Sequence, residues 1–300
     1  MRITTESLST SSWHDYLELC KPRVVALMLL TSLVGMLLAS HEPVSWQILL
    51  FGNLGIGLLA GAGAAINHIV DRKIDSIMAR TQNRPLVTGK VDTPQALAFA
   101  LCLAVAGMVV LVWQVNVLTA WLTLASLLGY AVVYTLFLKR LTPQNIVIGG
   151  LAGAMPPLLG WTSVTGQVDP HALLLVLIIF AWTPPHFWAL AIHRRKEYAQ
   201  ADIPMLPVTH GVAYTKLHVL LYTLILFAVS LLPFITEMSG LIYLIGAVLL
   251  GGRFLYWAIA LMFDRHRHAP VKTFKYSITY LMLLFVVLLA DHHYRTLGIG

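Results

Sequence analysis

Long apolar runs alternate with short polar segments along the whole chain. Nine runs approach or exceed the roughly 20 residues that a helix needs to cross a bilayer. They cover residues 24–40, 46–66, 95–114, 117–138, 144–162, 171–192, 217–236, 240–263 and 273–291. The pattern predicts an all-α integral membrane protein with nine transmembrane helices. Little chain remains outside these runs, so we expect one intramembrane domain over residues 1–300.

Composition and charge placement support this interpretation. Of the 300 residues, 58% are hydrophobic and 11% are charged, whereas soluble domains carry about 25% charged residues. Most Lys and Arg residues lie in segments 1–23, 67–94, 139–143, 193–216 and 264–272, and the loops on the other side contain none. By the positive-inside rule these segments are cytoplasmic, including the N-terminal segment 1–23. Topology therefore explains the net charge of +7 without a nucleic-acid partner.

Two carboxylates and an amide follow the second apolar run at a spacing of four. Because four residues advance a helix by about 400°, Asn67, Asp71 and Asp75 would share one stripe at the membrane edge. Carboxylates four residues apart repel each other mildly, so an ordinary solvated helix surface gains nothing from this arrangement. Hard oxygen ligands suit Mg²⁺, which is commonly bound by one or two carboxylates together with substrate phosphates. The spacing favours an enzyme that binds a phosphorylated, membrane-soluble substrate.

Other polar groups stand out against the apolar background. Proline pairs interrupt two runs, at Pro156-Pro157 and Pro184-Pro185, and such kinks in a membrane are expected to face protein or a watery cavity. His186 follows the second pair, where an ionisable group often marks function but can also be a neutral His bonded to a carbonyl freed by the kink. Arg253 lies mid-span, and we expect it to face the bundle.

Several stretches carry a resemblance to a known family. They are Lys21-Pro22-Arg23, the Asn67–Leu86 loop, Lys139-Arg140-Leu141-Thr142, the run from Asn145 to Trp161, and the segment from Trp182 through His186 and Tyr198 to Pro207. The first loop resembles the first aspartate-rich motif of the intramembrane UbiA-like prenyltransferases. The Pro-Pro-His-Phe-Trp stretch and Pro-Met-Leu-Pro are similar to the heme-farnesylating branch of that superfamily. The resemblance covers nearly the whole chain.

The resemblance implies a ring of nine helices around a central, lipid-accessible cavity, with catalytic loops 67–94 and 193–216 at its cytoplasmic mouth. The implied reaction transfers farnesyl from farnesyl diphosphate to a vinyl group of heme b, giving heme O in the cell's inner (plasma) membrane. The implied Mg²⁺ ligands are Asp71 and Asp75, assisted by Asn67, and Glu197 joins these three as a catalytic candidate. The diphosphate-binding candidates are Arg72, Lys73, Arg80, Arg84, Lys139 and Arg140. The acceptor candidates are His186, His193, Trp188 and Tyr198.

The second loop departs from the wider superfamily, whose quinone-pathway members carry paired Asp residues there. This chain has His193 and Glu197 at that spacing, which a simple capping or ion-pair arrangement also explains. Glu197 and Asp202 are five residues apart and would not share a helix face. Prenylation of an aromatic quinone precursor, a transporter and a non-catalytic assembly factor remain alternatives. A downstream heme enzyme or oxidase is a possible recipient of the product.

Overall fold

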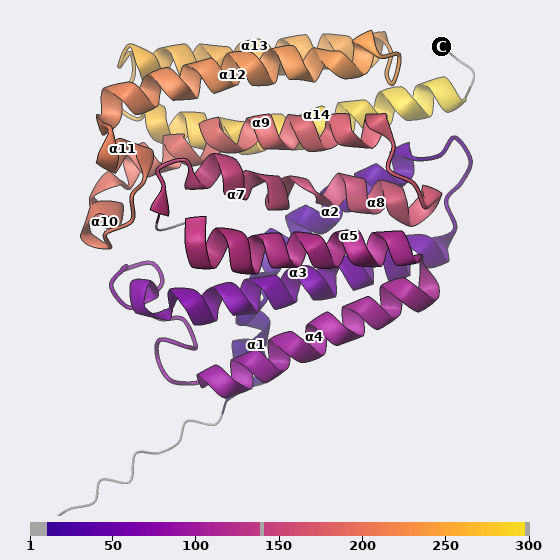
Figure 1. Cartoon of the computed structure of the whole chain (residues 1–300). Coiled ribbons are helices and arrows are strands. Elements are labelled where there is room, and N and C mark those ends of the chain that lie inside the picture. Colours follow the sequence, from indigo (N-terminus) through magenta and orange to yellow (C-terminus); the bar gives the residue numbers. More distant parts are fainter. Residues whose placement is uncertain (1–10, 139–140, 298–300) are drawn as a thin grey trace, which may run out of the picture.

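The computed structural model describes residues 11–138 and 141–297, which fold into helices joined by short connections (Figure 1). In the first half these are α1 (Trp13–Leu19), α2 (Pro22–Leu38), α3 (Trp46–Asp75), α4 (Thr93–Gln114), α5 (Val117–Leu128), the π-helix η1 (Gly129–Leu138), α7 (Asn145–Ala154) and α8 (Pro156–Thr165). In the second half they are α9 (Pro170–His193), α10 (Arg195–Gln200), α11 (Leu206–Thr209), α12 (Gly211–Ile235), α13 (Leu241–Met262) and α14 (Ala269–Thr296).

The number of spans agrees with the apolar pattern. Eight helical segments of the described chain are long and apolar enough to cross a membrane, and α1 with α2, bent by 55°, makes a ninth. The chain is thus a multi-pass membrane protein. Helix α3 continues past the apolar run 46–66 to Asp75, as the helical spacing of Asn67, Asp71 and Asp75 predicted. Residues 67–75 form the last turns of the same helix, so the polar stripe is rigidly joined to a transmembrane span.

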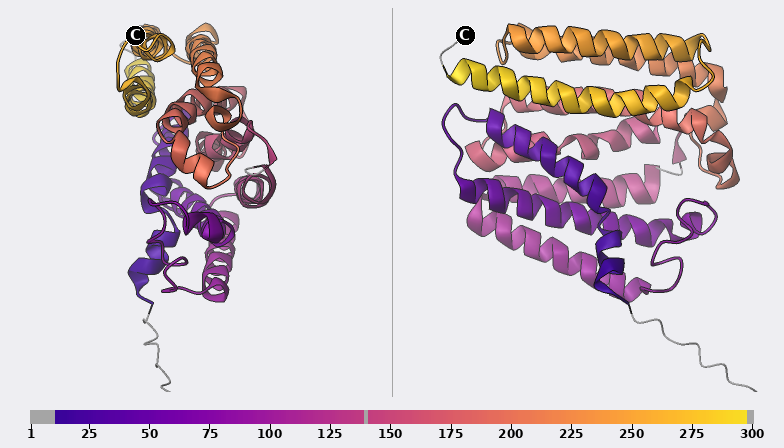
Figure 2. Two further views of the ribbon diagram at one scale, coloured as in Figure 1. Left: turned by 90° about the vertical axis from the view of Figure 1, so that its left-hand side faces the viewer. Right: turned by 180° about the vertical axis from the view of Figure 1, so that it is seen from behind.

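The helices form two packed groups with a middle layer (Figures 1 and 2). Helices α9, α12, α13 and α14 pack as a four-helix bundle, while α3 packs against α4 and α5. Between them α2 crosses α8 at very close range. A Cβ on Gly35 would lie 2.1 Å from the Pro157 carbonyl oxygen, and one on Gly160 would lie 1.9 Å from the Ser32 carbonyl oxygen. Only glycine permits this approach, which is typical of helix packing in membranes.

The two proline pairs have different effects on their helices. Pro156 opens α8 directly after α7, so the helix is interrupted at Met155, while Asn145–Thr165 still counts as one span. Pro184 and Pro185 lie inside α9, which stays helical around them. All four prolines are buried. They face protein, as predicted, where neighbouring groups can accommodate the backbone polar atoms that they leave unpaired.

We call the end of the bundle that carries connections 76–92 and 194–210 the basic end. Both connections lie at this end, with α10 and α11 at the left of Figure 1, as the sequence predicted. Met78 of the first connection belongs to one buried apolar cluster with Tyr198, Ile203 and Met205 of the second. The two loops are therefore joined by hydrophobic packing. Lys139 and Arg140 lie outside the described residues.

Candidate functional site

The last turns of α3 carry a row of buried oxygen-bearing side chains. Asn67, Asp71 and Asp75 are 4%, 3% and 4% exposed, and they share one face of the helix. Arg72 and Lys73, between them in sequence, are exposed on another face, and Arg72 donates to Thr93 Oγ1 at 3.5 Å. The row therefore faces the protein interior, whereas these two diphosphate-binding candidates point away from it.

Two cations from other segments contact this row. Lys21, at the N-cap of α2, donates a hydrogen bond from Nζ to the side-chain oxygen of Asn67. Arg84 donates from a guanidinium nitrogen to Asp75 Oδ2 at 2.5 Å, and its side chain is 20% exposed. Thr81 donates to the Asp75 carbonyl oxygen at 3.0 Å, which turns the loop back so that Arg84 can reach α3. Opposite charges thus meet in a largely buried site, where their attraction is stronger than in water.

The π-helix η1 supplies the wall opposite the row. Asn67 Nδ2 donates to Thr135 Oγ1 at 3.4 Å, and the Asp71 carboxylate acts electrostatically on both Tyr130 and Tyr134. The two tyrosine rings are stacked, with centroids 5.7 Å apart. Single turns of π-helix are frequent at functional sites. The sequence analysis missed these tyrosines, although their spacing of four in an apolar run is a usable signal.

His68 was also missed. It follows Asn67 in sequence, is only 2% exposed, and lies within electrostatic reach of Lys21 and Arg84. Among the residues described, neither of its ring nitrogens has a hydrogen-bond partner. The ring thus lies near the same two cations as the oxygen row. Its place beside Asn67 at the end of an apolar run was the available sequence signal.

The second connection contributes different chemistry. Glu197 is half-buried and forms an ion pair with Arg194 at 3.6 Å. Glu197 therefore pairs with Arg194 and not with His193. The helix is interrupted at Arg194 (φ −103°, ψ 21°), so His193 ends α9 while Glu197 belongs to the separate helix α10. His193 and Asp202 are exposed.

Tyr198 links the two connections. Its ring is 8% exposed, and the hydroxyl lies within electrostatic reach of Arg80 in the first connection and Tyr134 in η1. Burial raises the pKa of Tyr198 above its usual value, so the phenol is neutral at physiological pH. Of the acceptor candidates, Tyr198 is thus the one that lies within electrostatic reach of Tyr134, which Asp71 also reaches.

The remaining acceptor candidates lie deeper in α9. His186 is 8% exposed, its ring stacks on Trp182 at 4.1 Å, and Nδ1 is 2.7 Å from Ser277 Oγ of α14. Because Ser277 Oγ itself donates to the Phe274 carbonyl oxygen at 2.6 Å, Nδ1 is the donor and Nε2 keeps its lone pair. One of the two sequence interpretations paired His186 with a carbonyl freed by the kink, whereas the observed partner is a serine of another helix. Trp188 is fully buried against His218 and Tyr222, which makes it a core residue.

The oxygen row fits a hard cation bound together with substrate. Within residues 11–138 and 141–297, no three His, Cys, Asp or Glu side chains form a complete metal site. Two carboxylates and an amide on one buried face provide the partial ligand set that Mg²⁺ takes when phosphate oxygens and water complete its shell. The positive charges of Arg84 and Lys21 can offset the negative charge that such oxygens add. The residues present therefore fit Mg²⁺ held jointly with a diphosphate.

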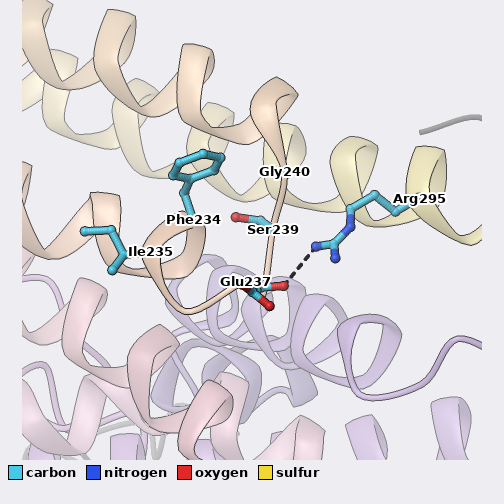
Figure 3. A pocket seen from close by; sticks show the side chains of 6 residues that line it. All are labelled: Phe234, Ile235, Glu237, Ser239, Gly240 and Arg295. Atoms are coloured by element: carbon cyan, nitrogen blue, oxygen red, sulfur yellow. Dashed lines mark hydrogen bonds between the residues drawn. The ribbon is translucent and has the colours of Figure 1, made fainter.

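Two hollows lie away from this row. One of about 470 Å³ opens at the opposite end of the bundle, where Arg295 donates to the Glu237 carbonyl oxygen at 3.1 Å (Figure 3). It holds one cation and one carboxylate, which does not match a diphosphate. The other, of about 60 Å³, is an apolar crevice between α2 and α14 lined by residues such as Leu30, Val34 and Phe285.

Comparison with known proteins places this geometry in a family. The model of the UbiA prenyltransferase family matches residues 28–288. The protoheme IX farnesyltransferase of Hahella chejuensis is 71% identical, with 98% of each chain covered. That of Marinobacter nauticus is 73% identical over 95% of this chain and 94% of its own. Among solved structures, a digeranylgeranylglyceryl phosphate synthase is similar (TM-score 0.79, 19% identity, 93% of this chain and 98% of that one). A UbiA homologue of Archaeoglobus fulgidus bound to DMAPP and Mg²⁺ is also similar (TM-score 0.62, 15% identity, 91% and 99%).

Proposed function

Because this chain belongs to the UbiA prenyltransferase family, and its near-full-length relatives are protoheme IX farnesyltransferases, we propose that it makes heme O. It transfers farnesyl from farnesyl diphosphate to a vinyl group of heme b. The observation that carries the site assignment is the buried row Asn67, Asp71 and Asp75 with Lys21 and Arg84 against it. These relatives favour heme farnesylation over transport and over prenylation of a quinone precursor.

The end of α3 and the first connection bind the donor in this proposal. Asp71 and Asp75, with Asn67, would hold Mg²⁺, which supplies positive charge to the departing diphosphate. Arg84 and Lys21 add cations from the protein itself, and Arg80 extends them toward Tyr198. Fixed cations in a buried site stabilise negative charge as the bond from farnesyl C1 to oxygen breaks and the electron pair leaves with the diphosphate. The stacked Tyr130 and Tyr134 present aromatic faces that stabilise an allylic cation beside the row.

The acceptor step uses the second half of the molecule. A vinyl carbon of heme b bonds to farnesyl C1, and water adds to the resulting cation and loses a proton, leaving a hydroxyethylfarnesyl chain. His186 is the residue we assign to the heme, since Ser277 holds its Nδ1–H and leaves Nε2 free to bind iron. Glu197 and His193 lie nearer the surface, so we place them at the entrance of the site and not among the metal ligands.

Placement in the membrane completes the proposal. The chain lies in the cell's inner membrane with the basic end in the cytoplasm, because the Lys and Arg residues gather at that end. Diphosphate then binds from the aqueous side while the farnesyl tail and heme come from lipid. A downstream heme enzyme would take up the product.

One assay tests donor and acceptor together. Full-length protein reconstituted in lipid with farnesyl diphosphate, Mg²⁺ and heme b should yield heme heavier by farnesyl plus water, measured by mass spectrometry. Chelation of Mg²⁺ should abolish the product, since the diphosphate charge would then rest on protein cations alone. If active protein instead prenylated a hydroxybenzoate and left heme unchanged, the heme assignment would be wrong.

A further inference from the structure

Arg253 is a cation inside a membrane span that the proposed reaction does not use. It lies in α13, nine residues before the last residue Met262, which is about 13 Å along the helix. The sequence analysis expected it to face the bundle, but its side chain is exposed. The reason is that small and apolar residues, Gly251 and Phe254, occupy the inward face of α13 at this level. A charge on the lipid side of a span is costly unless something compensates it.

Arg253 and a second cation share one tryptophan. The Arg253 guanidinium carbon lies 6.0 Å from the centroid of the Trp257 ring, one turn nearer the basic end. Lys272 Nζ, from the first turns of α14, lies 5.3 Å from the same centroid. Thr273 of α14 donates to the Trp257 carbonyl oxygen at 3.3 Å, which ties the two helices together there. The result is a half-buried indole at the contact of α13 and α14, with the cationic groups of two exposed side chains near its ring.

The charges in this hairpin are strongly unbalanced. Residues 241–290 contain the cations Arg253, Arg265, Arg267, Lys272 and Lys275, and Asp264 is their only acid. Asp264 pairs with Lys216 of α12 at 2.5 Å, so it is already engaged. No ion pair of the described residues includes Arg253 or Lys272. Two like charges at a lipid-facing indole repel each other, and an anion between them would turn that repulsion into attraction.

We propose that this part of the α13–α14 surface binds the phosphate of an anionic phospholipid, with Arg253 and Lys272 as its cations and the Trp257 indole beside them. A lipid is the occupant because Arg253 starts within the span and reaches toward the basic end, the level at which headgroups and interfacial tryptophans lie. Basic pockets between transmembrane helices on the cytoplasmic side are a recurrent form of anionic-lipid site. The site lies outside the farnesyl-transfer machinery and does not depend on the assignment of that reaction.

Lipid retention by the full chain tests the proposal. Protein in mixed micelles is titrated with phosphatidylglycerol or phosphatidylcholine, and bound lipid is measured by native mass spectrometry. Wild type should retain phosphatidylglycerol preferentially. Arg253→Gln and Lys272→Gln should each weaken retention about fivefold, as expected for one cation near the membrane surface. Lys275→Gln is the matched control, since it removes the same charge from an exposed position on α14, and it should retain lipid like wild type.

Three outcomes would overturn the assignment. They are an equal loss in Lys275→Gln, no preference for phosphatidylglycerol in wild type, and displacement of the lipid by millimolar glycerol phosphate, which would make this a site for soluble anions. Arg253→Lys keeps the charge and should restore retention, so a loss that Lys does not rescue in a protein that still farnesylates heme also counts against the proposal.

Discussion

The two connections at the basic end occupy matching places, one after α3 and the other after α9, yet they present different chemistry to the interior. The first follows a helix that runs without interruption to Asp75, so its oxygens lie buried in a row and meet Lys21 and Arg84. The second follows a helix that breaks at Arg194, so Glu197 turns to its own neighbour and stays half-exposed. Helix continuity at the membrane edge, more than the presence of carboxylates, accounts for the buried oxygen row that we propose binds the diphosphate.

The second connection still has a part in the site. It closes over the first through the apolar cluster of Met78, Tyr198 and Met205, and it brings the neutral phenol of Tyr198 toward Arg80. One loop thus supplies charge, and the other excludes water and positions aromatic surface. Exclusion of water strengthens the electrostatic interactions of the charged loop.

The largest effect should come from Asp71→Asn. This change keeps the shape of a buried side chain and removes its charge. Turnover should fall about a hundredfold or more, which is the typical loss when one electrostatic contact to a transition state is removed. Initial rates of heme O formation at saturating substrates measure it. Thermal unfolding should match wild type, and unchanged turnover in a folded variant would remove Asp71 from the site.

Arg84→Gln should have an intermediate effect. It removes the cation that contacts Asp75, and loss of one charge-assisted contact to the diphosphate should cost about tenfold in kcat/KM for farnesyl diphosphate. Arg72→Gln is the matched control, because it removes the same charge from an exposed face of the same end. If both variants lose activity equally, net charge rather than the buried arrangement governs donor binding.

Glu197→Gln should have the smallest effect. Its ion pair with Arg194 is partly exposed, so the free energy of unfolding should change by less than about 1 kcal/mol. Turnover and the Mg²⁺ concentration for half-maximal rate should remain close to wild type. A loss comparable to that of Asp71→Asn would mean that the second loop holds metal too, and the contrast between the loops would disappear.

Hydrophobic patterning alone predicted the spans, the all-helical fold and the joint location of the two long loops, because transfer into lipid requires long apolar runs with satisfied backbones. Spacing alone determined that Asn67, Asp71 and Asp75 share a face, because helix periodicity is local. The tertiary structure decided that this face is buried and that Lys21, 46 residues away in sequence, contacts it. It also decided that Tyr130 and Tyr134 form the wall, that Glu197 pairs with Arg194, and that Arg253 faces outward. These outcomes depend on how separate helices rotate and pack against each other, and a local sequence pattern does not specify this packing.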